Sequence, residues 1–183
     1  MLTPLPAEEW DDQAREALAS TVPPERRRPD AAGNALSTLV RHPALAGAFL
    51  PFNTYLQKSS TLPARTRELV ILRTSHHLGC SYEWGHHAAM ARLLGLTDAE
   101  VESARTGSGT NEFDQAVLDA VDDMHTGAQI SAQVWQRLGH WLDDRQRMDL
   151  MFTFGGYSTL ALALNTFDVQ LEDGAGADEY YSA

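Results

Sequence analysis

Residues Ala64–Gly95, ARTRELVILRTSHHLGCSYEWGHHAAMARLLG, predict the centre of the fold. The segment follows Pro63, which suits the first turn of a helix because its missing N–H would have no helical partner there. Glycine is favoured where helices end, so Gly79 and Gly95 mark the ends of two successive helices. Almost no residues are left to join them. The sequence therefore predicts an antiparallel helix pair hinged at Gly79.

Helical patterns recur outside this pair, and strand patterns are nearly absent. Residues 35–59 are predicted to form one helix, or two helices broken near Pro43 and Pro51. The other predicted helices cover residues 7–20, 97–105, 112–126, 131–142 and 144–171. We therefore expect one all-α domain over residues 1–183. Its parts are an N-terminal arm and helix at 1–34, motif-bearing helices at 63–103 and a flexible tail at 172–183.

The composition limits the classes of function. The chain has 183 residues, 43% of them hydrophobic, and a net charge of −11, which argues against nucleic acid as a partner. A single cysteine excludes an intrachain disulfide. No apolar run reaches membrane-spanning length, and the N-terminus lacks the basic and apolar regions of a signal peptide. We expect a cytoplasmic protein without a membrane or nucleic-acid partner.

The predicted helix at 144–171 is apolar on nearly all sides in its centre, FTFGGYSTLALALNTF. Such a helix is buried in a large core or in a subunit interface, and a chain of this length has limited core. We therefore expect a homo-oligomer. Asn165 is the polar exception, predicted either to bond a backbone group at an interface or to line a substrate pocket.

The second helix of the pair carries a stripe of reactive side chains. Cys80, Glu83 and His87 are three and four residues apart, so they share one helix face. Antiparallel packing brings Glu68 of the first helix level with His87, where its carboxylate can fix the tautomer of the imidazole and strengthen it as a base. His86 points about 100° away from His87 and is expected to leave the stripe.

Each of these residues also has a simpler interpretation. At a helix start the pKa of Cys80 is expected to be lowered, but a lone cysteine is more often inert. Tyr82 can donate a proton, and Trp84 can form a pocket wall or part of the core. An inward-pointing arginine among Arg65, Arg67 and Arg73 could hold a substrate carboxylate. Cys80, Glu83 and His87, with His76 or His77, could also bind zinc, although their spacing matches no zinc motif.

The stretch from Arg67 to Glu102 resembles the carboxymuconolactone decarboxylase and alkylhydroperoxidase D-like family. In its peroxidase branch a Cys-x-x-Cys pair is followed four residues later by a histidine, with a glutamate twelve residues before the first cysteine. Cys80, His87 and Glu68 occupy the matching positions, and Glu83 replaces the second cysteine. The resemblance implies an alkylhydroperoxidase D-like helical bundle, trimers or hexamers, and, for the decarboxylase branch, no metal or organic cofactor.

These observations favour a cofactor-free lyase or isomerase that acts on a small organic acid or lactone. In this hypothesis His87 moves the proton, Glu68 orients it, Glu83 or Tyr82 is the second proton-transfer group, and Cys80 lines the pocket. The first alternative is a thiol peroxidase that uses Cys80. The second alternative is a helical binding protein without catalytic activity.

Overall fold

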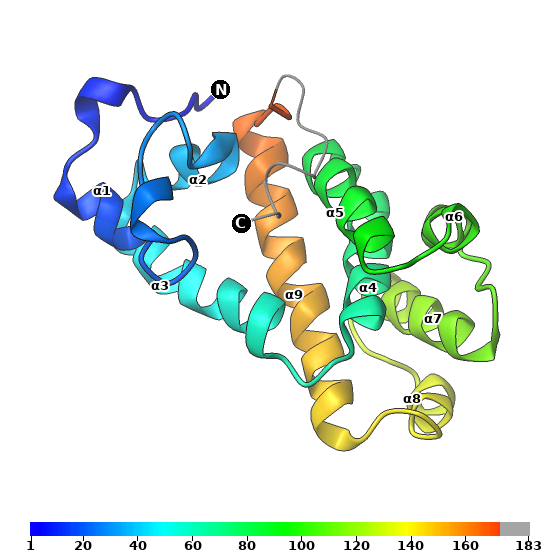
Figure 1. The fold of residues 1–183 in the computed structure, drawn as a ribbon. Helices are drawn as coiled ribbons and strands as arrows, with labels where there is room; N and C mark the ends of the chain where they lie inside the picture. The colour runs from blue at the N-terminus through cyan, green and yellow to red at the C-terminus, as the bar shows by residue number, and fades with distance from the viewer. Residues whose placement is uncertain (173–183) are drawn as a thin grey trace.

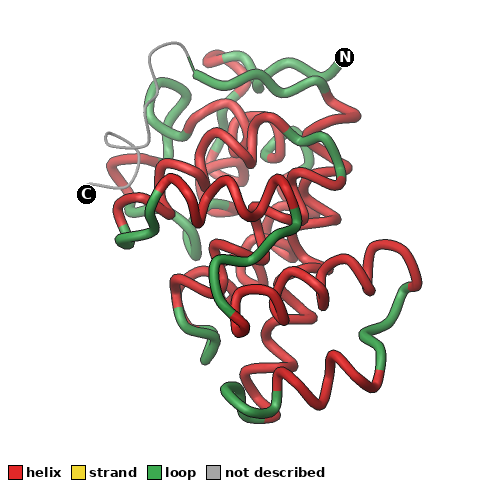
Figure 2. Tube along the Cα trace, turned by 90° about the vertical axis from the view of Figure 1, so that its right-hand side faces the viewer, coloured by secondary structure: helices red, strands yellow, loops and turns green. Residues whose placement is uncertain are grey.

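The computed structural model describes residues 1–172, so the predicted tail lies outside the described residues except for Glu172. This part of the chain is helical and contains no strand (Figure 2). The α-helices are α1 (Asp12–Ala17), α2 (Gly33–Leu39), α3 (Pro43–Thr54), α4 (Ala64–His77), α5 (Ser81–Leu93), α6 (Asp98–Thr106), α7 (Glu112–Gly127), α8 (Ala132–Leu138) and α9 (Asp144–Phe167). Two short 3₁₀ helices lie at Ala7–Glu9 and Pro24–Arg26, and a π-helix lies at Tyr55–Ser59.

Helix α9 runs through the middle of the molecule (Figure 1). Helices α1, α2 and α3 lie on one side of it, and α4 to α8 lie on the other (Figure 1). Helix α4 packs against α5, α6, α7 and α9. The all-α prediction is confirmed, and so is the antiparallel α4–α5 pair.

The hinge between α4 and α5 forms as its sequence predicts. Gly79 has φ of +61°, a left-handed conformation that a residue without Cβ adopts at little cost. The amide of Cys80 then donates to the carbonyl of Ser75 at 2.9 Å, which closes the end of α4. Helix α5 begins at the next residue, Ser81.

Some predicted helix boundaries are wrong. The helix predicted at 7–20 is a 3₁₀ turn followed by the short α1, and α8 ends at Leu138 rather than 142. Helix α3 continues through Pro51 and widens into the π-helix at Tyr55. A proline removes only one backbone donor, and the buried side chains of Leu50 and Asn53 hold the turns on either side in place.

The end of α9 is the difference that matters most for the site. The predicted helix runs to Leu171, but α9 ends at Phe167, because Asp168 adopts a left-handed conformation with φ of +61°. The amide of Val169 then bonds back to the carbonyl of Leu164 at 3.0 Å. The chain reverses, and residues 168–172 turn back instead of continuing the helix.

The buried apolar side chains form three groups. The largest lies among α4 to α9, and a second lies between α1, α2 and α3. A small third group joins Ala35 of α2, Cys80 and Tyr82 to Ala161 and Leu164 of α9. None of the described helices is long and apolar enough to cross a membrane.

Candidate active site

A cavity of about 260 Å³ lies between the α1–α3 side of the molecule and the helices α5 and α9. Its apolar wall comes mainly from leucines of α2, α3 and α9. The polar and charged side chains that line it are Thr21, Arg26, Asn53, Gln57, Lys58, Tyr82, Glu83, His86, His87 and Tyr157. Glu83 and His87 of the stripe on α5 therefore line a partly open cavity.

The predicted contact between Glu68 and His87 is present. Nδ1 of His87 lies 2.6 Å from Oε2 of Glu68, and both side chains are buried. Two guanidinium nitrogens of Arg67 lie 3.4 Å from the other oxygen of Glu68. With an ionised Glu68 as the acceptor, His87 carries its hydrogen on Nδ1 and leaves Nε2 as the basic nitrogen. Among the described residues, Nε2 has no hydrogen-bond partner.

Glu83 lies one turn before His87 on α5 and is 3% exposed. Burial raises the pKa of its carboxyl well above the usual value, and the nearby charge of Glu68 raises it further. Within the described residues, Oε2 of Glu83 has no hydrogen-bond partner. A raised pKa favours the protonated form of the carboxyl, which can donate a hydrogen bond or a proton to a ligand.

The opposite wall of the cavity presents an amide. Asn53 of α3 is 4% exposed, and its Nδ2 has no partner in the described part of the chain. Next to it, Nε2 of Gln57 donates to the hydroxyl of Tyr157 at 3.0 Å. A buried unpaired donor is costly, so Asn53 is suited to a ligand acceptor. Asn53 is missed by sequence reasoning, and the only signal is a lone amide in the apolar stretch around Pro51.

Cys80 lies on a different side of α5. It borders a second cavity of about 240 Å³ together with Trp84, His76 and Arg105, and it does not line the cavity of His87. Burial raises the pKa of the thiol to about 11, although the backbone N–H groups of Glu83 and Tyr82 oppose the rise. The predicted lowering of this pKa is therefore wrong, because desolvation exceeds the field of the helix start.

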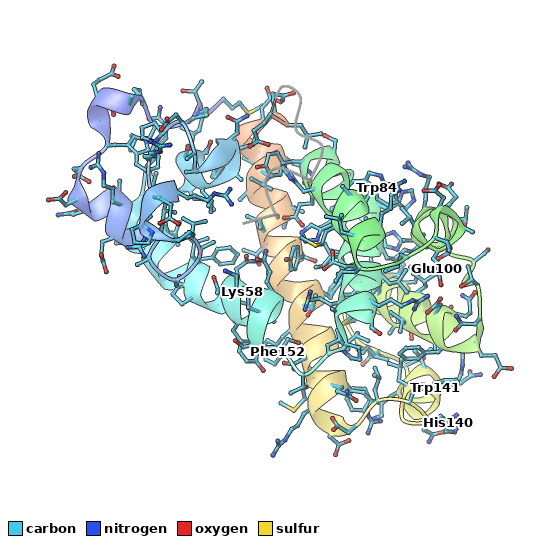
Figure 3. All side chains as sticks on the ribbon, in the orientation of Figure 1. Lys58, Trp84, Glu100, His140, Trp141 and Phe152 are labelled. Atoms are coloured by element: carbon cyan, nitrogen blue, oxygen red, sulfur yellow. The ribbon has the colours of Figure 1, made fainter. Side chains whose placement is uncertain are left out.

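The two predicted substrate-binding residues also lie elsewhere. Trp84 packs against Arg105, whose guanidinium carbon lies 4.3 Å from the centroid of the Trp84 ring. In Figure 3, Trp84 lies well apart from Lys58, which lines the His87 cavity. Asn165 is exposed, and its Nδ2 donates to the carbonyl of Leu78 at 2.8 Å. Neither residue lines the cavity of His87. Asn165 bonds a backbone carbonyl and Trp84 packs against the largest apolar core, which are the alternative interpretations that the sequence offers for them.

The arginines considered for substrate binding serve other purposes. Arg65 pairs with Asp114 and Glu100, each at 2.6 Å. Arg73 pairs with Asp122 at 2.6 Å and donates to the carbonyls that end α6. The cations that do line the cavity are Arg26 and Lys58. No sequence signal marks them, because only tertiary packing brings the 3₁₀ helix of Arg26 and the π-helix of Lys58 to the cavity.

Tyr82 lines the cavity of His87, and so does His86, which is 4% exposed. The ring of His86 leaves the stripe of Cys80, Glu83 and His87 as expected, but it still reaches the cavity because the cavity extends over the neighbouring face of α5. Its Nε2 lies 3.0 Å from Glu172, which also accepts a hydrogen bond from the hydroxyl of Tyr82. In residues 1–172, no three His, Cys, Asp or Glu side chains are grouped closely enough to hold a metal ion.

The sequence resemblance is confirmed by comparison with protein families. Residues 43–122 match the sequence model of the carboxymuconolactone decarboxylase family, a range that contains Glu68, Glu83 and His87. No curated protein matches the chain.

Solved structures share the fold. An uncharacterized peroxidase-related protein from Ralstonia eutropha, with an alkylhydroperoxidase AhpD core, aligns with a TM-score of 0.73 and 17% identity over 94% of each chain. The apo form of the debrominase Bmp8 aligns with a TM-score of 0.73 and 16% identity over 94% of this chain and 92% of that one. A cysteine-to-alanine variant of the same debrominase, solved with 2,3,4-tribromopyrrole, gives 0.70 and 17% identity over 94% and 91%.

Proposed function

Because residues 43–122 match the carboxymuconolactone decarboxylase family, and because Glu68 and His87 form a buried pair beside a cavity, we propose that the protein is an acid/base enzyme. We infer that it acts as a lyase or isomerase on a small organic acid or lactone, without a metal or organic cofactor. The observation that carries the proposal is the 2.6 Å contact between Glu68 and Nδ1 of His87. This contact holds the ring so that Nε2 is the atom that takes a proton from the substrate.

Glu83 supplies the hydrogen-bond donor that complements the base His87. Its carboxyl, whose pKa burial raises well above the usual value, lines the same cavity as His87. As a proton next to a carbonyl is removed, negative charge develops on the carbonyl oxygen, and a neutral carboxylic acid can stabilise that charge by donating a hydrogen bond. This assignment favours Glu83 over Tyr82 as the partner of His87, since the hydroxyl of Tyr82 already donates to Glu172.

The charges of the lining support an anionic or carbonyl-rich substrate. The protein has a net charge of −11, yet Arg26 and Lys58 line the cavity. Glu83 provides a carboxyl group in the cavity lining, and the pKa of this group is raised. Glu68 and Glu172 lie behind the two histidines rather than in the wall. A carboxylate or a lactone carbonyl therefore meets donors and cations in this space.

The thiol peroxidase alternative is less well supported. A peroxidatic cysteine reacts as the thiolate, and the pKa of about 11 keeps Cys80 protonated near neutral pH. Cys80 also lies outside the cavity that holds His87 and Glu83.

Hydrogen–deuterium exchange tests the proposal without knowledge of the substrate. Small 2-oxo acids, 3-oxo acids and γ-lactones are incubated with the protein in D₂O, and loss of the proton next to the carbonyl is followed by NMR. We expect at least one compound to exchange faster than in buffer. The rate should fall by about 10²–10⁴ in His87→Gln, which removes the base. His140→Gln, at an exposed histidine, is the matched control and should keep the native rate.

Two results would count against the proposal. Exchange that is equally fast in the native protein and in His87→Gln would show that His87 is not the base. Tight binding of these compounds with no exchange of any of them would favour a binding protein instead.

A further inference from the structure

Two side chains of the cavity wall carry a buried polar atom without a partner. In the described part of the chain, five buried side-chain nitrogen or oxygen atoms lack a hydrogen-bond partner. Two of them, Nδ2 of Asn53 and Oε2 of Glu83, belong to residues that line the cavity of His87. Such atoms are rare in folded proteins, because the bonds to water that they lose on burial are not replaced. Two of them in one cavity indicate a ligand that completes their hydrogen bonds.

Helix α9 fixes how the walls of the cavity face each other. It runs opposite in direction to both α3 and α5 (Figure 1). The hydroxyl of Tyr157 of α9 accepts from Nε2 of Gln57 at 3.0 Å. The ring of Tyr157 also lies edge-on to the ring of His87, with 5.1 Å between the two centroids. Tyr157 therefore joins Gln57 on one wall to His87 on the other, at one level of the cavity.

Asn53, Glu83 and Leu160 lie one helical turn away from the level of Tyr157. Asn53 and Glu83 each precede the residue at that level by four positions, and Leu160 follows Tyr157 by three. Because α9 runs against the other two helices, all three steps lead the same way along the cavity (Figure 1). All three residues line the cavity. The amide of Asn53 and the carboxyl of Glu83 therefore face each other across it, beside the apolar side chain of Leu160.

The groups at this level suit an oxygen atom that carries negative charge. Nδ2 of Asn53 can only donate a hydrogen bond. Burial and the charge of Glu68 raise the pKa of Glu83, which favours the protonated form, and the hydroxyl of that form also donates. Lys58 of the π-helix lines the cavity as well, and its Nζ is held by the carbonyl of Thr21 at 3.0 Å. An oxygen between the two walls thus meets two donors and lies near a positive charge.

We propose that Asn53 and Glu83 form a two-donor site for one oxygen, the carbonyl oxygen of the substrate, and that Asn53 is a further catalytic residue. The inference rests on the function proposed above. When the C–H bond next to the carbonyl breaks, its proton passes to Nε2 of His87 and its electron pair shifts to the carbonyl oxygen. The two donors bind the resulting enolate oxygen more tightly than the carbonyl oxygen, because its negative charge is greater. The site thus selects compounds whose acidic C–H bond is next to a carbonyl.

Pentafluorophenolate tests the oxygen site independently of any reaction. This compound is ionised at neutral pH, resembles an enolate, and has one oxygen as its only strong hydrogen-bond acceptor. Fluorine NMR titration measures its dissociation constant, and pentafluorobenzene, which lacks the oxygen, is the matched compound. We expect Asn53→Leu and Glu83→Leu each to weaken phenolate binding by about 10–100-fold, since a hydrogen bond to a charged group is lost. Both variants should leave the binding of pentafluorobenzene nearly unchanged.

Further variants separate the loss of a donor from damage to the fold. Glu83→Gln keeps a side-chain donor in the same place and should retain most of the phenolate binding. Asn165→Ala removes an amide outside the cavity, whose Nδ2 donates to the carbonyl of Leu78, and should leave binding unchanged. Asn53→Leu removes a donor without a partner, so the melting temperature of the ligand-free protein should be kept or increased. An amide that the fold requires would instead lower it by about 4 °C or more.

Proton exchange connects the oxygen site with the reaction. For the carbonyl compound that exchanges fastest in D₂O, Asn53→Leu should lower kcat by about 10²–10³, the usual cost of removing one donor to a developing oxyanion. KM should change much less, because the uncharged carbonyl of the bound substrate gains less from the donor than the enolate does.

The results separate this inference from the proposed function. Phenolate binding that depends on both Asn53 and Glu83, without exchange of any carbonyl compound, would support the two-donor site and overturn the acid/base function. Exchange that is equally fast in the native protein and in Asn53→Leu would overturn this inference alone. Phenolate binding that is weakened by Glu83→Leu but not by Asn53→Leu would also overturn it, because the two side chains would not share an oxygen. So would a native protein that does not bind the phenolate.

Discussion

At the scale of single residues, burial decides which groups on α5 are charged. Cys80 is the N-cap of α5 and Glu83 lies in its first turn, and both positions favour anions. The structure nevertheless raises the pKa of both groups, because each is removed from water. Glu172 is less buried and has three donors, and its pKa falls to about 2. Burial raises the pKa of a carboxyl, and hydrogen-bond donors lower it. The balance of these two effects therefore sets the ionisation of each carboxyl at this site.

The first prediction concerns Cys80. A thiol with a pKa of about 11 has far less thiolate at pH 7.5 than an ordinary cysteine, so alkylation by iodoacetamide should be slower by about two orders of magnitude in the folded protein than in urea. Mass spectrometry of the labelled chain measures both rates. Labelling that is as fast in the folded state as in urea, or rapid peroxide turnover that disappears in Cys80→Ser, would restore the peroxidase alternative.

The second prediction concerns stability and Glu83. The folded state holds the proton of Glu83 more tightly than the unfolded state, whose pKa is about 4.3. Folding therefore loses stability as pH rises above that value, by at most about 1.4 kcal/mol per pH unit. Glu83→Gln should remove this loss, so its melting temperature relative to the native protein should increase from pH 5 to pH 8. A difference that is constant over this range would mean that Glu83 is ionised in the fold.

At the scale of elements, α9 packs closely against the π-helix that follows α3. Gly156 of α9 faces Leu56 of the π-helix, where an added Cβ would lie 2.6 Å from Cδ1 of the leucine. Leu56 is fully buried and cannot move aside without disturbing its neighbours. The same helix has a glycine at 155 with open space around its Cα.

The two glycines provide a matched pair of variants. Gly156→Ala should destabilise the fold by about 1–3 kcal/mol through overpacking. Gly155→Ala should change stability by less than that, or increase it slightly, since alanine favours helix. Urea unfolding of both variants measures the difference. Equal stability of the two variants would show that α9 and the π-helix can separate freely at this point.

At the scale of the whole molecule, we propose that the exposed apolar side chains of α3 and α9 are covered by a second copy of the chain. Phe52, Met151 and Phe152 are each more than a third exposed, and all three line a groove of about 510 Å³ (Phe152 is labelled in Figure 3). Patches of this kind on a globular protein mark association sites. Leu162 of α9 is 58% exposed as well, whereas Leu164 is buried.

The exposed apolar groove predicts which substitutions change the assembly of the protein. Phe152→Glu should dissociate an oligomer without loss of helicity, as judged by sedimentation and circular dichroism. Leu45→Glu is the control, because Leu45 is an exposed leucine of α3 that lies outside the groove. This substitution should leave assembly intact. Leu164→Glu should instead unfold the chain, because its side chain lies in the core. A native protein that sediments as a monomer at micromolar concentration would contradict the proposal.

The sequence by itself determined the helical class, the hinge at Gly79 and the contact between Glu68 and His87. These features are local: a glycine without Cβ sets the turn, and helix periodicity then sets which residues are level across it. The tertiary structure alone decided that Cys80 and Trp84 face away from the cavity and that His86 faces into it. It also decided that Arg26, Lys58, Asn53 and Glu172 join the site, since segments distant in the chain meet there only after packing. Ionisation depends on the same packing, because the free energy of a charge is set by the water and the donors around it rather than by its neighbours in sequence.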